Sequence, residues 1–205
     1  MKNYIKLVLL LIVLLFNGCK NNNDEHKECC KPTDLSEELG KNSDVESLYL
    51  IEGSWLNEEG VPFELEGLKG KVQVVSMIFS HCEYACPRLI ADMQQIEEKI
   101  PSDKRDQVNF LLVSFDVERD TPQRLKEFKT MENLGDNYTF LHGNEAEVRM
   151  LSVLLNIKYE KQSDGNFAHS NIITVLDQNG VIRNQIEGLG ADPKPILNTI
   201  SSLVK

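Results

Sequence analysis

Two nearly continuous apolar runs dominate the pattern of hydrophobic and polar positions along the chain. They are VQVVSMIFS (72–80) and VNFLLVSFD (108–116), and such runs, rich in β-branched residues, are typical of strands covered on both faces. Two other segments alternate around a turn signal: residues 54–71 around Glu59-Gly60, and residues 171–188 around Asn179-Gly180. Both segments are predicted to form hairpins.

Four stretches show apolar residues at helical spacing. The first begins at Pro87, the second is capped by Thr121 and runs to about Leu134, and the fourth follows Pro193. The third is capped by Asn144, and its core-facing residues are expected to be Val148, Leu151, Leu154 and Leu155. Strands joined through helices pair in parallel, whereas hairpins add antiparallel strands. The chain is therefore predicted to be an α/β protein with a thioredoxin-like fold, in which helices cover both faces of a central mixed sheet that an N-terminal hairpin extends.

The first residues have the composition of an export signal. Residues 5–16, IKLVLLLIVLLF, form a run of 12 residues that is apolar except for Lys6, whereas a membrane span needs about 20. A basic start with a short apolar run is typical of a secretory signal. The run ends in FNGC, which resembles the lipobox of bacterial lipoproteins, with an ordinary signal peptide or an uncleaved anchor as alternatives. We expect residues 1–18 to be a lipoprotein signal peptide and Cys19 to be the acylated first residue of the mature chain.

Residues 19–46 are predicted to be a flexible polar linker, because they contain few large apolar residues. His26, Cys29 and Cys30 lie in this segment and form either an auxiliary metal or thiol site or an incidental pair. The folded domain is expected to occupy residues 47–205. A lipid on Cys19 would anchor this domain to a membrane of the cell envelope on the extracytoplasmic (periplasmic) side, where disulfides can form.

The charge of the chain excludes nucleic acid as an expected partner. The whole sequence has a formal net charge of −10, and removal of residues 1–18 would leave 20 basic against 32 acidic residues. Binding to phosphate needs a basic face. An anionic lipid surface is an equally poor partner, so the lipid anchor rather than charge is expected to hold the protein at the membrane.

The segment FSHCEYACPRL, residues 79–89, carries the clearest chemical signal. Cys82 follows the first buried strand, and Cys86 lies four residues further on, in the loop or first turn of the next helix. In α/β proteins, ligands bind beyond the carboxyl ends of the strands of the sheet. This spacing lets both sulfurs touch one ion, and a small loop adjustment would allow a disulfide. A metal site, a redox-active pair, and inert or structural cysteines are all compatible with the spacing.

Four separated segments resemble the Sco/SenC family of copper-binding thioredoxin-fold proteins. They are FSHCEYACPRLIADM, LLVSFDVERDTPQRL, FLHGNEAEVRMLSVLLNIKY and FAHSNIITVLDQNG. The resemblance covers residues 50–203, and it implies that Cys82, Cys86 and His169 bind copper. It also implies a role in assembling the copper A centre of cytochrome c oxidase, or in supplying another respiratory copper protein. Some family members are better described as thiol-disulfide reductants of that centre's cysteines.

The sequence departs from the family pattern at two places. The residues between the cysteines are EYA, where the family commonly has proline and aspartate, and Val117 stands where proline is frequent. Neither change touches a ligand, although the first could alter the choice of partner. The donor types agree with copper, because thiolates suit Cu(I) and imidazole also suits Cu(II).

Expectations also follow for the histidines and for two aspartates of the quoted segments. His169 is expected on the loop that enters a strand, and His142 in a turn. His81 is expected to point away from Cys82. Asp116 and Asp120 could orient His169 from behind the ligands, or could cap the helix that begins after Thr121.

Three function classes are compatible with these residues. The first is a copper metallochaperone, which is not an enzyme, and the second is a thiol-disulfide oxidoreductase that uses Cys82 and Cys86. The third, a thiol peroxidase, is disfavoured because those enzymes place threonine where this chain has Phe79. Thioredoxin-like reductases usually face their dithiol with a cis-proline, whereas NFAHSN offers His169 and no proline. This difference favours the copper hypothesis.

Overall fold

The computed structural model describes residues 47–205. The predicted signal peptide, Cys19, and the linker with Cys29 and Cys30 lie outside the described residues. None of the helices in residues 47–205 is both long and apolar enough to span a lipid bilayer.

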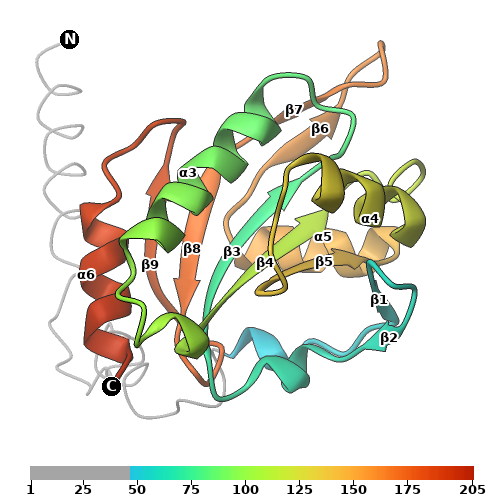
Figure 1. The fold of residues 1–205 in the computed structure, drawn as a ribbon. Helices are drawn as coiled ribbons and strands as arrows, with labels where there is room; N and C mark the ends of the chain where they lie inside the picture. The colour runs from blue at the N-terminus through green and yellow to red at the C-terminus, as the bar shows by residue number, and fades with distance from the viewer. Residues whose placement is uncertain (1–46) are drawn as a thin grey trace, which may run out of the picture. The chain divides into compact units, whose positions relative to one another are not determined.

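A seven-stranded mixed sheet forms the centre of the domain, in the order β2-β1-β5-β4-β3-β8-β9 (Figure 1). The strands are β1 (Trp55–Asn57), β2 (Pro62–Phe63), β3 (Val72–Ile78), β4 (Val108–Ser114), β5 (Tyr138–His142), β8 (Ile172–Leu176) and β9 (Ile182–Glu187). β3, β4 and β5 run parallel, and β1 and β8 join them antiparallel from either side. A separate two-stranded sheet consists of β6 (Tyr159–Lys161) and β7 (Phe167–His169).

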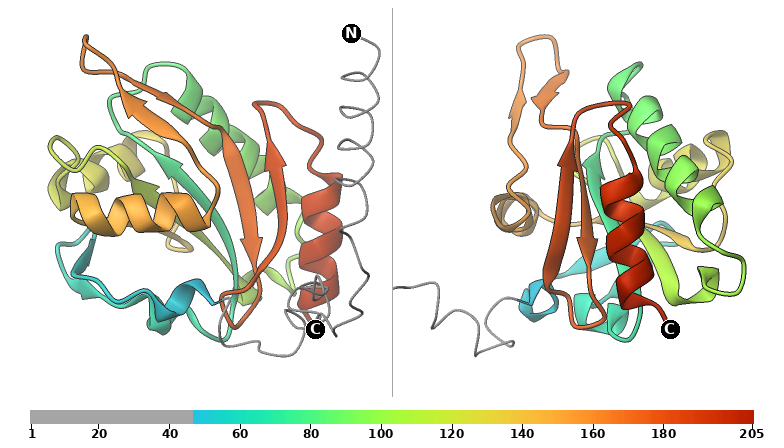
Figure 2. Two further views of the ribbon diagram at one scale, coloured as in Figure 1. Left: turned by 180° about the vertical axis from the view of Figure 1, so that it is seen from behind. Right: turned by 90° about the vertical axis from the view of Figure 1, so that its left-hand side faces the viewer.

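Helices cover both faces of the main sheet. They are α3 (Ala85–Lys99), α4 (Pro122–Met131), α5 (Glu145–Leu154) and α6 (Lys194–Leu203), with short 3-10 turns at η1 (Leu48–Leu50), η2 (Leu65–Leu68) and η3 (Arg105–Gln107). α3, α4 and α6 lie on one face of the sheet. α5 and the β6–β7 hairpin lie on the side of the other face (Figure 2). Every residue of β3 is buried between these layers, as its apolar run predicts. The predicted α/β class is confirmed.

Several predicted boundaries differ from the structure. α3 begins at Ala85 rather than Pro87, and α4 ends at Met131 rather than near Leu134, because Asn133 takes the left-handed conformation (φ 55°) that ends a helix. Leu154 was predicted to face the core but is 47% exposed. It is the last residue of α5, and Leu155, which follows the helix, is the one that is buried.

The hydrophobic pattern of the sequence does not predict three of the short strands. β5 has only five residues, and β6 and β7 have three each. In β6 only Tyr159 is buried, so the alternation that would reveal a strand is missing. The β6–β7 hairpin carries His169, one of the three residues expected to bind copper.

Glu58 ties the β1–β2 hairpin to the core through a buried ion pair. Its side chain is 8% exposed, lies 2.6 Å from Lys129 Nζ of α4, and accepts the Phe140 N–H at 3.0 Å. We expect Glu58→Ala to lower the free energy of unfolding by about 3 kcal/mol, because it leaves the Lys129 ammonium without its counter-charge. Urea denaturation measures this loss.

Glu59 provides the matched control for that variant. Its ion pair with Lys126 is half exposed on both sides, at 50% and 54%, and such pairs contribute less than about 1 kcal/mol. Equal losses of stability in Glu58→Ala and Glu59→Ala would contradict the importance assigned to the buried pair.

Candidate metal centre

Cys82 and Cys86 lie at the carboxyl end of the central strand β3. Cys82 is in the loop between β3 and α3, and Cys86 is in the first turn of α3, as the sequence predicts. Both are free thiols, Cys82 half-buried and Cys86 buried. The Cys86 N–H donates to Cys82 Sγ at 3.3 Å, and the Phe79 N–H donates to Cys86 Sγ at 3.5 Å. The start of α3 therefore holds the two side chains against each other.

The two thiols are electrostatically unequal. A hydrogen bond from the Cys86 side chain lowers the pKa of Cys82 to about 4, against the effect of burial, and the N–H groups of Cys86 and Tyr84 assist. The hydrogen bond to Cys82, followed by burial, raises the pKa of Cys86. Cys82 is therefore the thiolate of the reduced pair, and Cys86 keeps its proton.

Alkylation by iodoacetamide should reveal this thiolate. Thiolate is the reactive form, so a lowered pKa should keep the rate for Cys82 nearly constant from pH 8 to pH 6 and halve it near pH 4. An ordinary thiol, with a pKa near 8.5, would lose about tenfold per pH unit below that value. The measurement uses a chain with Cys19, Cys29 and Cys30 changed to serine. A tenfold fall between pH 8 and pH 7 would contradict the assignment.

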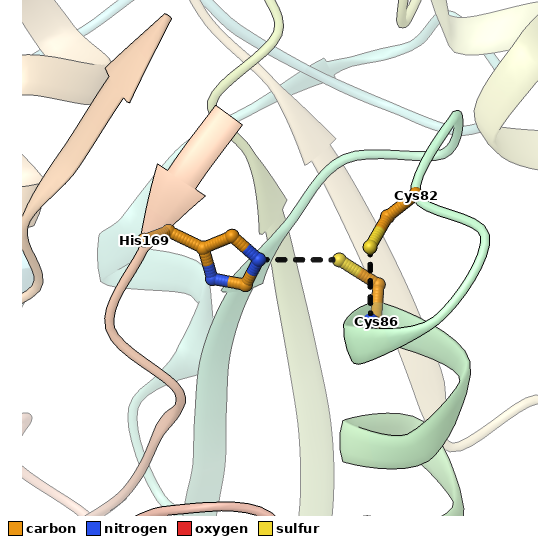
Figure 3. Close-up of side chains that lie close together, drawn as sticks. All are labelled: Cys82, Cys86 and His169. Carbon is orange, nitrogen blue, oxygen red and sulfur yellow. Dashed lines mark hydrogen bonds between the residues drawn. The ribbon is translucent and has the colours of Figure 1, made fainter. Parts of the chain in front are cut away.

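His169 approaches the cysteines from the other sheet. It is the last residue of β7, rather than a loop residue as expected, and its ring packs 6.0 Å from the ring of Phe79 and 5.1 Å from that of Phe115. Nδ1 lies 3.1 Å from the carbonyl of Ser170, and Nε2 lies 3.9 Å from Cys86 Sγ (Figure 3). With the proton on Nδ1 donated to that carbonyl, Nε2 presents a lone pair to the sulfurs.

The three side chains fit a single ion. One ligand atom from each of Cys82, Cys86 and His169 lies within 4.8 Å of the others. Bonds of about 2.0–2.3 Å place the ligands of one metal roughly 3.5–4.5 Å apart, so a small contraction completes the site. Two soft thiolates and one imidazole suit copper in either oxidation state.

The family of the chain is shown by a match that covers nearly all of the described residues. A model of the SCO1/SenC family matches residues 49–205. The chain belongs to the SCO1/SenC family. It is 27% identical over 135 residues to a candidate copper-binding protein of Stutzerimonas stutzeri, and the match covers 64% of this chain and 65% of that protein. It is 29% identical over 141 residues to the SCO1 protein homolog of Bacillus subtilis, covering 67% and 72%.

Solved structures of SCO1/SenC proteins share the fold. A SCO1/SenC family lipoprotein of Bacillus anthracis superposes with a TM-score of 0.67 at 26% identity, over 75% of this chain and 94% of that one. BsSco, described as having a disulfide switch and as a member of the Sco family of cytochrome c oxidase assembly proteins, gives 0.64 at 27% identity, over 76% and 93%. The thioredoxin-like architecture predicted from the sequence is confirmed.

The other histidines in residues 47–205, His81 and His142, are not part of the group of ligand atoms formed by His169 and the cysteine pair. His81 is 40% exposed, and its Nδ1 lies 3.4 Å from Asp120 Oδ1. His81, Asp116 and Asp120 form a second group of closely spaced ligand atoms, but hydrogen bonds already occupy the Asp120 carboxylate. His142 is the last residue of β5 rather than a turn residue, which corrects the prediction.

Asp116 and Asp120 face groups other than His169. Hydrogen bonds among residues 47–205 join neither carboxylate to His169, whose Nδ1 faces Ser170 instead. Neither carboxylate caps α4, because Thr121 does so with its own hydroxyl, which accepts from the Arg124 N–H at 3.3 Å. Asp116 pairs with Arg119, and Asp120 binds Ser80. Arg119 and Arg124 have no predicted role, although both lie in the segment LLVSFDVERDTPQRL.

Proposed function

We propose that this protein binds one copper ion through Cys82, Cys86 and His169 and delivers it during assembly of the copper A centre of a cytochrome c oxidase. The proposal rests on the convergence of the two neighbouring cysteines with a histidine from a distant part of the chain. Cys86 and His169 are 83 residues apart in sequence, yet their ligand atoms are 3.9 Å apart. Membership of the SCO1/SenC family supports copper as the ion, as does the relative from Stutzerimonas stutzeri.

The ligand set suits a carrier better than a permanent holder. Three protein ligands leave a coordination position open on copper, and an acceptor's thiolate or imidazole can enter there before the donor's ligands leave. Cys82 is half-buried, so an acceptor can reach its side of the site, whereas buried Cys86 keeps hold of the ion. Transfer then proceeds by stepwise exchange of ligands, with no change in the oxidation state of the copper.

A second candidate function is reduction of a partner's disulfide. The low pKa of Cys82, next to a protonated Cys86, is the observation that favours it. The Cys82 thiolate would attack one partner sulfur, form a mixed disulfide and release the other sulfur as thiolate. Cys86 would then lose its proton to solvent and attack the Cys82 sulfur, which breaks the mixed disulfide and releases the second partner sulfur as thiolate. The partner thereby gains two electrons, and this chain forms the 82–86 disulfide. BsSco, with its disulfide switch, supports this alternative.

Cells that lack this chain test the proposal. We expect their cytochrome c oxidase to contain little copper A, measured by its electron paramagnetic resonance signal, and added copper to restore part of it. Copper cannot replace a missing reductant, so this rescue favours delivery over thiol reduction. The wild-type chain should restore the signal fully, and a chain with Cys82→Ser and Cys86→Ser should not. A normal copper A signal in cells without the chain would refute the proposal.

Attachment to the membrane through an acylated Cys19 is part of this proposal. The test is whether a Cys19→Ser variant leaves the membrane fraction, and a variant that stays there with normal processing would point to an uncleaved anchor.

A further inference from the structure

One segment, residues 114–124, contacts both of the arms that carry the proposed copper ligands. It runs from the end of β4 into the first turn of α4. One arm is the β3–α3 loop with Cys82, and the other is the β6–β7 hairpin with His169. The polar residues of this segment are not among the three proposed copper ligands.

Asp120 and Arg124 bind the cysteine arm at Ser80, two residues before Cys82. Asp120 is fully buried, and its carboxylate accepts the Ser80 N–H at 2.8 Å and the Ser80 hydroxyl at 2.6 Å. Arg124 donates to the Ser80 hydroxyl at 2.8 Å and to the Ser80 carbonyl at 3.0 Å. Every polar group of Ser80 therefore has a partner in this segment, which fixes the backbone that leads into Cys82.

Arg119 binds the histidine arm at the turn between β6 and β7. It donates to the carbonyl of Gly165 at 2.6 Å, and its Nε pairs with Asp116, a carboxylate that is 1% exposed. The ring of Phe115, in the same segment, packs 5.1 Å from the rings of Phe167 and His169. A two-stranded hairpin has little stability alone, so these contacts help to hold His169 in place, together with those between Tyr159 and Arg149 of α5.

The two halves of the segment are connected by hydrogen bonds. The Asp116 N–H donates to the Ser114 hydroxyl at 3.0 Å, and that hydroxyl donates to Asp120 at 2.7 Å. A path of hydrogen bonds and one ion pair thus runs from Gly165 on the hairpin to Ser80 on the cysteine loop.

We propose that Arg119 and Asp120 are positioning residues for the copper site, with Arg119 holding the hairpin that presents His169 and Asp120 holding the loop that presents Cys82. This inference rests on the proposed function, because it assumes that the three ligands share one ion. Neither residue contacts that ion. Because the two residues act on different arms, a change at Arg119 should displace the imidazole alone. A change at Asp120 should displace the thiolates alone.

The test compares variants on each side of the segment, using Cu(II) and Cu(I) alone as probes and a chain with Cys19, Cys29 and Cys30 changed to serine. Arg119→Ala should lower Cu(II) affinity about 10-fold, as loss of outer-shell partners does. It should also weaken the nitrogen coupling in the electron paramagnetic resonance spectrum while leaving Cys82 alkylation within about twofold. Arg119→Lys, which keeps the pair with Asp116, should restore part of the affinity.

Variants on the cysteine side should show the opposite pattern. Asp120→Asn should lower Cu(I) affinity about 10-fold and change the Cys82 alkylation rate several-fold, with the nitrogen coupling of Cu(II) retained. Arg124→Gln acts on the same Ser80 groups and should change both quantities in the same direction, so it serves if Asp120→Asn does not fold.

Asp177 offers a matched control. It is buried, pairs with Arg183 and accepts two backbone N–H groups, as a structural carboxylate does. It follows β8, whose Leu176 pairs with Gln73 near the start of β3, and so lies at the opposite end of the sheet from Cys82. Asp177→Asn should lose stability but keep wild-type copper affinities and spectra.

Three outcomes would overturn the inference. One is a wild-type Cu(II) affinity and spectrum in Arg119→Ala, and another is a loss in Asp177→Asn as large as that in Arg119→Ala. The third is failure of the wild-type chain to bind copper, which overturns the proposed function as well. If the wild type binds copper and His169→Ala loses the nitrogen coupling while Arg119→Ala keeps it, only the positioning role fails.

Discussion

Replacing Cys86 with alanine is expected to lower the affinity of the protein for Cu(I) at least about 100-fold. Structural zinc sites with four ligands are worth about 10–16 kcal/mol, or roughly 3 kcal/mol per ligand, and each 1.4 kcal/mol is a factor of ten. Cys86 is the buried donor, and its removal leaves one thiolate and one imidazole, a poor ligand set for Cu(I). Cys82→Ala should have a similar effect, because it removes the ionised thiol.

Competition with a chromogenic Cu(I) chelator measures this affinity. The background chain carries serine at Cys19, Cys29 and Cys30, so that only the 82/86 pair supplies thiols. Ser152→Ala serves as control, because Ser152 is another small buried side chain, 2% exposed, but lies on α5. An unchanged affinity in Cys86→Ala would rule out a site with three ligands.

The second large effect is expected in His169→Ala, which should lower Cu(II) affinity at least about 100-fold while slowing reduction of a small-molecule disulfide by less than about twofold. Imidazole is the donor that suits the harder Cu(II) ion. Disulfide exchange depends instead on the attacking thiolate, and the Cys86 hydrogen bond is the first cause of the low Cys82 pKa, with His169 the smallest contributor.

Both quantities should be measured in the same His169→Ala protein, followed by oxidase activity in cells that carry it. His81→Ala is the matched control, because His81 is the neighbouring histidine whose Nδ1 faces Asp120. Loss of copper binding together with oxidase activity supports copper delivery, whereas loss of copper binding alone favours the thiol reductant. If neither copper affinity nor oxidase activity changes, the ligand assignment of His169 is wrong and His81 becomes the next candidate.

The cysteine half of the site could be predicted from local sequence, whereas the histidine half could not. The apolar run that contains β3 ends at Ser80, two residues before Cys82, and helical spacing begins at Pro87, directly after Cys86. The strand–loop–helix arrangement is therefore visible in one short stretch. His169 reaches the cysteines because the β6–β7 hairpin packs on Phe115 and is bound by Arg119 at Gly165. That packing joins residues far apart in sequence, and only the family resemblance pointed to His169.

The buried carboxylates show the same limit of local patterns. Asp120 lies in a polar stretch that looks like an ordinary loop, and its partner Ser80 is 40 residues away. Sequence alone suggested that Asp120 acts on His169 or on the start of α4, whereas the structure directs it to the cysteine loop. A polar residue's partner depends on how the sheet brings the strand ends together, and the hydrophobic pattern does not record that arrangement.

The ligands of the copper can be identified by X-ray absorption at the copper edge, on the protein loaded with one equivalent of copper. We expect one tightly bound copper per chain with two sulfur neighbours and one imidazole nitrogen. We also expect the sulfur signal to fall by half in Cys82→Ala and the imidazole signal to disappear in His169→Ala. If the wild-type chain retains no copper, or if its copper has only nitrogen and oxygen neighbours, the site formed by Cys82, Cys86 and His169 is contradicted.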